Sequence, residues 1–138
     1  QRDFARSARF HGITGFRMPS KFPIPSQAPA RIVLWLKAKD PALAVRVAKA
    51  LYGAYFGEDI DISSPDAAAA VAAREGVDAA AARAAIDDPA IKDALKREVE
   101  QAIARGACGS PFVFVAGAPF WGLDRFDQIE RWLATGGF

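Results

Sequence analysis

The chain has 138 residues, 51% of them hydrophobic and 25% charged, which is the composition of one ordinary globular domain. The formal net charge is only +2 and the basic residues are scattered, so we expect no nucleic-acid partner. No apolar run approaches the roughly 18 residues of a membrane-spanning helix, so we expect no membrane partner either. The single cysteine, Cys108, excludes an internal disulfide and a CxxC pair and fits a reducing cytoplasm; no metal site is expected.

The first third of the chain predicts a helix, a loop and a second helix. Residues 2–11 are predicted to be the end of a helix that stops at Gly12, since glycine is the common stop signal of a helix. Three prolines in residues 12–25 exclude regular hydrogen-bonded structure there. Residues 26–39 predict a helix that is buried on most sides, because its apolar positions are nearly continuous.

Three further helices begin at a capping residue followed by proline: Asp40-Pro41, Ser64-Pro65 and Asp88-Pro89. The first runs to about Phe56 and the last to about Arg105, while the alanine-rich stretch between them is divided into two short helices. Two of the helices carry apolar residues four apart, which predicts one buried stripe on each: Leu43, Val47, Leu51 and Tyr55, then Ile91, Leu95, Val99 and Ile103.

The C-terminal part predicts a β-hairpin followed by a helix. Residues 112–116 and 118–121 are strand-like and apolar on both faces, as in a sheet covered on both sides. An isolated two-stranded hairpin is marginal in water, and nothing upstream resembles a strand, so we expect that a leading β-α-β portion lies outside this sequence. Asp124 is expected to cap the last helix, whose predicted buried face consists of Phe126, Ile129, Trp132 and Leu133.

One motif carries specific information: Gly109-Ser110-Pro111-Phe112-Val113-Phe114-Val115, followed by Trp121-Gly122-Leu123-Asp124-Arg125. This sequence motif closely resembles that of the DsbA-like 2-hydroxychromene-2-carboxylate isomerases and their relatives, the kappa-class glutathione transferases. The resemblance implies an α/β, thioredoxin-like fold of DsbA type, with its N-terminal β-α-β half absent from this sequence. Residues 1–106 would then form a mainly helical insertion domain, and residues 107–138 the C-terminal half of the thioredoxin-like domain.

The resemblance also implies a glutathione site. In that family the proline before the strand is cis, here Pro111, and the residue ahead of it, Ser110, presents its backbone to a bound thiol compound. Asp124 would hold the α-ammonium of the γ-glutamyl group, although a plain role as a helix N-cap is an equally good reading of this residue. The residues that the resemblance assigns to glutathione binding are Ser110, Pro111, Trp121, Gly122, Leu123 and Asp124.

Lys21 is the remaining residue of the predicted site, and two further points concern Cys108 and the catalytic residue. Lys21 lies in a loop that corresponds to a substrate-side loop of the isomerases and could attract a carboxylate, whereas its alternative is a solvated loop lysine. Cys108 is expected to be a small buried residue, because a nucleophilic role would need a nearby base. The family's serine, which steadies the glutathione thiolate, has no match in this sequence, so the catalytic residue stays unassigned.

The function that the resemblance implies is glutathione-dependent isomerisation of 2-hydroxychromene-2-carboxylate in the breakdown of aromatic compounds. Glutathione would be the cofactor, a small aromatic carboxylate the substrate, and the protein a cytoplasmic homodimer. Three alternatives remain open at this point: a kappa-like glutathione transferase, a DsbA-like thiol-disulfide oxidoreductase, and a non-catalytic helical binding module.

Overall fold

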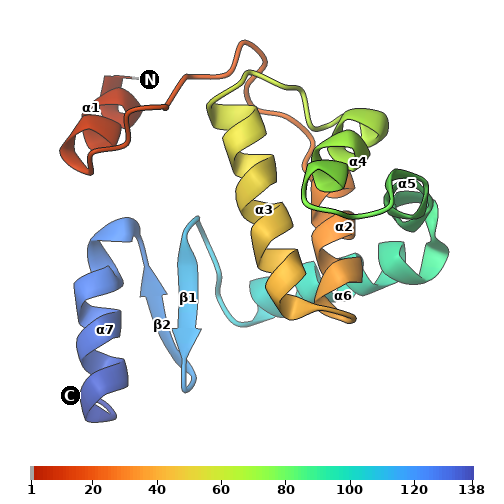
Figure 1. Cartoon of the computed structure of the whole chain (residues 1–138). Coiled ribbons are helices and arrows are strands. Elements are labelled where there is room, and N and C mark those ends of the chain that lie inside the picture. Colours follow the sequence, from red (N-terminus) through yellow and green to blue (C-terminus); the bar gives the residue numbers. More distant parts are fainter. Residues whose placement is uncertain (1) are drawn as a thin grey trace. The chain divides into compact units, whose positions relative to one another are not determined.

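The computed structural model describes residues 2–138 and divides into two compact units. The first unit ends at Leu95 and contains only helices; the second begins at Lys96 and contains a two-stranded antiparallel sheet and a helix (Figure 1). The division falls inside helix α6 (Pro89–Ala104).

The first unit is built from helices that begin where the sequence places capping residues. Asp40 Oδ1 accepts a hydrogen bond from the Leu43 N–H at 2.9 Å, and Ser64 Oγ accepts one from the Ala67 N–H at 3.4 Å. The predicted starts at Asp40-Pro41 and Ser64-Pro65 are therefore confirmed, since each side chain satisfies an N–H group that the first turn leaves unpaired. The third predicted start is confirmed as well, because α6 begins at Pro89. The helices are α1 (Arg2–Phe10), α2 (Gln27–Lys37), α3 (Pro41–Phe56), α4 (Pro65–Arg74) and α5 (Ala79–Asp87).

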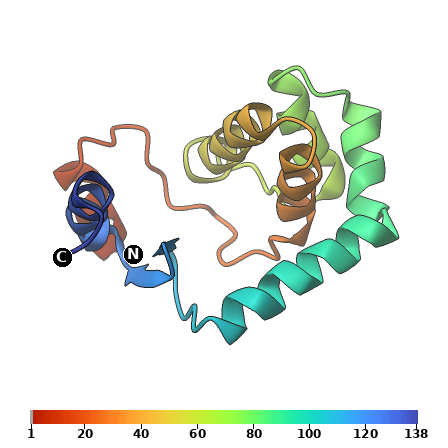
Figure 2. The ribbon, with the colours of Figure 1, turned by 90° about the horizontal axis from the view of Figure 1, so that it is seen from below.

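Helix α2 lies at the centre of this unit and packs against α3, α4 and α5 (Figures 1 and 2). The predicted stripe of α3 is confirmed, because Val47, Leu51 and Tyr55 are buried. Helix α2 is less buried than the sequence predicted. Ile32 and Leu36 are buried, whereas Leu34 and Trp35 are half-buried. The largest side chains that are fully buried in the core are Ile32, Val47, Val71 and Ile86.

The second unit confirms the predicted hairpin. Strands β1 (Phe112–Val115) and β2 (Ala118–Trp121) pair antiparallel, with Phe112 opposite Trp121. Ala116 and Gly117 form the turn with φ values of 48° and 88°, which matches the left-handed pair that a two-residue hairpin turn requires. Helix α7 (Phe126–Thr135) packs on the hairpin through Phe120, whose ring meets that of Trp132 edge-on at 5.6 Å.

Two predicted burial patterns are wrong for the chain as described. No residue of α6 is buried, and Val99 and Ile103 are 50% and 66% exposed. On α7 only Ile129 is buried, while Phe126 and Leu133 are 47% and 69% exposed. An apolar stripe indicates which face a helix would bury, but a neighbouring element has to cover that face before it leaves water.

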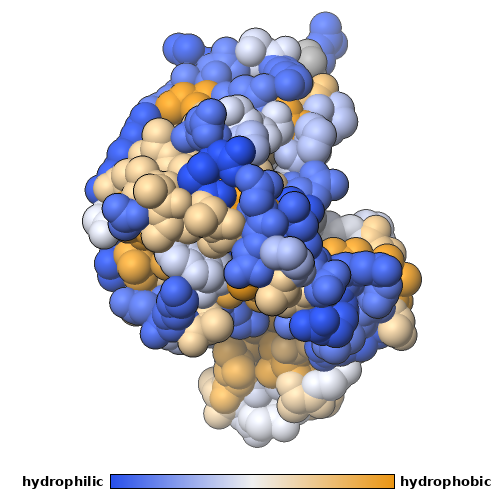
Figure 3. Space-filling model, turned by 90° about the vertical axis from the view of Figure 1, so that its right-hand side faces the viewer, coloured by the Kyte–Doolittle hydropathy of each residue, from blue (hydrophilic) through white to orange (hydrophobic). Residues whose placement is uncertain are grey.

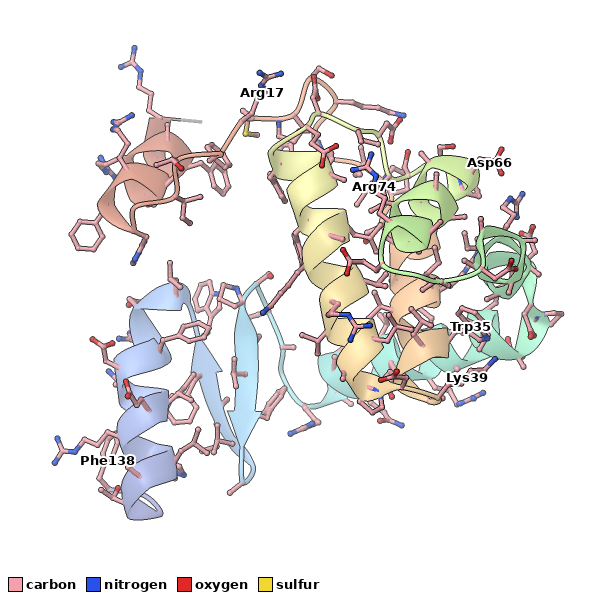
Figure 4. All side chains as sticks on the ribbon, viewed as in Figure 1. Arg17, Trp35, Lys39, Asp66, Arg74 and Phe138 are labelled. Atoms are coloured by element: carbon pink, nitrogen blue, oxygen red, sulfur yellow. The ribbon has the colours of Figure 1, made fainter. Side chains whose placement is uncertain are left out.

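The surface combines exposed apolar side chains with charged ones, as the orange and blue areas of Figure 3 show. In the first unit Arg74 pairs with Glu58 at 2.8 Å, and the Lys39 ammonium lies 4.4 Å from the centre of the Trp35 ring (Figure 4). Such exposed contacts each add little to stability. Within residues 2–138, every helix is too short or too polar to cross a bilayer.

Candidate functional site

The hairpin brings the two halves of the glycine-serine-proline motif together. The N–H of Gly122 donates a 3.0 Å hydrogen bond to the carbonyl of Pro111, one step beyond the pairing of Phe112 with Trp121. Ser110 and Pro111 therefore lie at the same end of the hairpin as the residues that follow β2. The Ser110–Pro111 peptide bond is cis, as predicted, and a second cis bond, Phe22–Pro23, was not foreseen.

Ser110 offers unpaired main-chain groups at this end of the hairpin. The residue is exposed, and its N–H and C=O make no backbone hydrogen bond within residues 2–138. An exposed N–H and C=O of one residue can pair with an extended peptide in the manner of an added strand. The arrangement suits a peptide-like ligand that runs along this edge.

The region after β2 differs from the sequence prediction. A 3₁₀ turn, η1 (Leu123–Arg125), precedes α7, and the N-cap position of α7 is Arg125, with no side-chain capping bond. The predicted role of Asp124 as the cap of the last helix is therefore wrong. The extra turn places Asp124 inside η1, two residues before α7 begins, where its carboxylate does not meet the first N–H groups of that helix.

Asp124 instead folds back over Gly122. A Cβ atom placed on Gly122 would lie 2.4 Å from Asp124 Oδ1, and Gly122 has a φ of 109°. The carboxylate of Asp124 is 72% exposed and lies 3.3 Å from Arg125 Nη1. The N–H groups of Leu123 and Asp124 have no backbone acceptor in the part of the chain that the structure describes. An exposed carboxylate and two unpaired donors thus lie side by side at the start of η1.

Trp121 and Gly109 make a contact that the sequence did not predict. The Trp121 indole is 58% exposed, yet a Cβ atom on Gly109 would lie 2.3 Å from its Nε1 atom. The indole therefore lies directly against the main chain that leads into Ser110. Neighbouring Cys108 is a free and exposed thiol, so the prediction that it is a small buried residue was wrong.

Lys21 lies in the first unit and is held by a carboxylate from a distant loop. Its Nζ atom donates to Asp61 Oδ2 at 2.7 Å, and Asp61 Oδ1 accepts hydrogen bonds from the N–H and hydroxyl of Ser63. The hydrogen bonds from Lys21 and then from Ser63 lower the pKa of Asp61 to about 2. Lys21 is thus an ion-paired residue, and only the structure identifies its partner.

The backbone around Lys21 is anchored as well. The buried Tyr55 hydroxyl donates to the Lys21 carbonyl at 2.8 Å, and the Ser20 N–H donates to Asp59 Oδ1 at 2.7 Å. Burial, followed by the nearby charge of Asp61, raises the pKa of the Tyr55 hydroxyl, which keeps it protonated as a donor. We call Lys21, Asp61 and Tyr55 the loop clasp. It joins the loop before α2 to the loop after α3.

The predicted glutathione-binding residues therefore all lie in the second unit, at one end of the hairpin. Lys21 lies in the first unit. A hollow of about 380 Å³ between α1 and the loop after it contains none of the predicted site residues; Ala5, Arg9 and Phe16 are among its lining. No group of three or more His, Cys, Asp or Glu side chains arranged to hold a metal ion occurs within residues 2–138.

Comparison with known proteins agrees on one family. Residues 1–134 match the family described as DSBA-like thioredoxin domain. A 2-hydroxychromene-2-carboxylate isomerase from Sphingobium xenophagum is 30% identical over 125 residues, which is 85% of this chain and 63% of that protein. The solved structure of selenomethionine 2-hydroxychromene-2-carboxylate isomerase superposes with a TM-score of 0.77 at 22% identity, over 96% of this chain and 63% of that one. The chain thus spans 63% of the length of both relatives.

Proposed function

Because the chain belongs to the DsbA-like thioredoxin domain family, we propose that the protein is a glutathione-dependent isomerase of the 2-hydroxychromene-2-carboxylate type. The named relative at 30% identity supports the isomerase class. The substrate would be a small aromatic carboxylate. We propose further that the enzyme works as a homodimer in the cytoplasm, where its free and exposed Cys108 thiol stays reduced.

The observation that carries the glutathione part is the set of unpaired polar groups at one end of the hairpin. The N–H and C=O of Ser110 have no backbone partner within residues 2–138 and suit the cysteinyl part of the tripeptide. The exposed Asp124 carboxylate suits the α-ammonium of the γ-glutamyl group. The N–H groups of Leu123 and Asp124 suit its carboxylate. These donors and acceptors match the cysteinyl main chain and the γ-glutamyl end of glutathione.

When bound, glutathione would supply a thiolate that adds reversibly to an unsaturated carbon of the ring-opened substrate, so that a double bond becomes a rotatable single bond. This chain would contribute orientation. In the second unit, Ser110 would fix the thiol compound along the hairpin edge. In the first unit, Lys21 is the residue that would attract a carboxylate. The Lys21 ammonium has three donors and gives one to Asp61, so two remain for a ligand.

The test is an assay of the intact protein with 2-hydroxychromene-2-carboxylate, with and without glutathione, followed by ultraviolet absorbance and mass spectrometry. We expect conversion to the ring-opened isomer only when glutathione is present. Conversion without glutathione would contradict the glutathione part of the proposal. An accumulating glutathione adduct would indicate a transferase instead. Absence of any reaction would contradict the isomerase part.

A further inference from the structure

Gly109, at the edge of the hairpin, leaves no room for a side chain, because the Trp121 indole lies against it. An added Cβ would meet three atoms of the Trp121 indole, at 2.3 Å from Nε1, 2.9 Å from Cε2 and 3.2 Å from Cδ1. Contacts under 3.0 Å force one partner to move, because such distances lie well inside the contact distance of carbon and nitrogen atoms. A residue with any side chain at position 109 would therefore displace the indole.

Backbone strain does not explain why glycine stands at this position. The φ angle of Gly109 lies outside the left-handed region, in contrast with that of Gly122 at 109°. The φ of Gly109 is therefore in a range that alanine also adopts. What Gly109 provides is the space that the indole occupies.

The indole in that space borders the edge that a ligand would use. Trp121 is the last residue of β2, and the next residue, Gly122, is hydrogen-bonded to Pro111. Gly109 directly precedes Ser110, whose main-chain groups are unpaired within residues 2–138. Trp121 as a whole is 58% exposed, so a ligand at this edge could reach it. An extended ligand paired with Ser110 would therefore run beside an aromatic wall.

We propose that Gly109 is a positioning residue, which holds the Trp121 indole as one wall of the thiol-binding edge at Ser110. The inference rests on the glutathione binding proposed above and adds a contact between the Trp121 indole and the ligand. Aromatic side chains give large contact areas with little conformational freedom to lose, so a correctly placed indole adds affinity at low entropic cost.

The experiment compares Gly109→Ala with the wild type in the intact protein. Calorimetric titration with glutathione should show a roughly three- to tenfold higher Kd for the variant, the range expected for loss of one aromatic contact. The indole Nε1–H signal of Trp121 in a ¹⁵N-¹H NMR spectrum should also move. The matched control is Gly15→Ala, because an added Cβ at Gly15 meets nothing within 4 Å and its φ is also outside the left-handed region.

A second pair of variants separates positioning from a general structural effect. Trp121→Ala should weaken glutathione binding about as much as Gly109→Ala, and combining the two should add nothing further, because both act through the same indole. Additive effects, or wild-type affinity in Gly109→Ala, would overturn the inference while leaving the proposed function in place. Absence of glutathione binding by the wild type would reject the proposed function and the inference together.

Discussion

Single residues at the end of the hairpin adopt conformations and make contacts that their residue types alone do not predict. Gly122 needs its left-handed φ of 109° and also lies under the carboxylate of Asp124. The presence of a turn after β2 could be predicted from the sequence, because glycine and aspartate favour turns. The 3₁₀ turn could not be predicted, because a cap at Asp124 satisfies the same local rules. Only the backbone path shows that Arg125 takes the N-cap position of α7.

Replacing Gly122 with alanine tests the strain at this residue. The variant should lose about 1–3 kcal/mol of unfolding free energy, since alanine is disfavoured at this φ and its Cβ would displace Asp124. Urea denaturation followed by circular dichroism measures the loss. Gly53→Ala is the control: it lies in helix α3 with nothing within 4 Å of an added Cβ, and it should be neutral or stabilising. Equal effects of the two substitutions would contradict the strain at Gly122.

Replacing Asp124 with alanine separates ligand binding from folding. Within residues 2–138 the exposed carboxylate does not cap α7, and its one ion pair is with Arg125 on the surface, so the midpoint of unfolding should hardly change. Glutathione affinity should fall about ten- to a hundredfold, the effect expected for loss of a charge-assisted hydrogen bond. Asp127→Ala, a neighbouring exposed carboxylate in the first turn of α7, is the control. Unchanged affinity would remove Asp124 from the site.

Among the helices and strands, the features that could be predicted are those that depend on residues close together in the sequence. The helix starts at Asp40 and Ser64 follow from caps and prolines, and the hairpin follows from two apolar runs with a short turn. The loop clasp has no such signal, because Asp61 lies 40 residues from Lys21. A lysine in a proline-rich loop does not indicate which distant carboxylate it will meet.

The loop clasp gives a pH prediction. The pKa of Asp61 is lowered to about 2 in the folded protein, below its ordinary value near 4, so the ion pair stabilises the fold above pH 4. This contribution disappears as the pH falls from about 4 to about 2, because protonation removes the carboxylate charge. Asp61→Asn should therefore lower the unfolding midpoint at pH 6, and the difference from the wild type should shrink toward pH 2.

Thermal unfolding of the wild type and Asp61→Asn at several pH values makes this comparison. The difference between the two proteins isolates Asp61 from other carboxylates such as Asp87, whose pKa is also lowered, chiefly by its hydrogen bond from Arg83. A difference that stays constant from pH 6 to pH 2 would show that the ion pair with Lys21 does not contribute.

At the scale of the whole molecule, sequence and structure agree on a DsbA-like thioredoxin fold. The order of helices, hairpin and last helix could be predicted because each element has its own periodicity and end signals. How much of α6 and α7 is buried could not be predicted, because burial depends on the elements that pack against these helices. The chain spans 63% of the length of each relative. On α6 and α7 the apolar residues Val99, Ile103 and Leu133 are exposed to water.

We propose that glutathione binds at the hairpin end formed by Ser110 and the start of η1. Titration of the ¹⁵N-labelled intact protein with glutathione, followed by amide NMR signals, tests it most directly. We predict saturable shifts concentrated at the amides of Ser110, Leu123 and Asp124, with the Ala116–Gly117 turn at the opposite end of the hairpin unchanged. No saturable shift, or shifts confined to residues outside the hairpin end, would contradict the account.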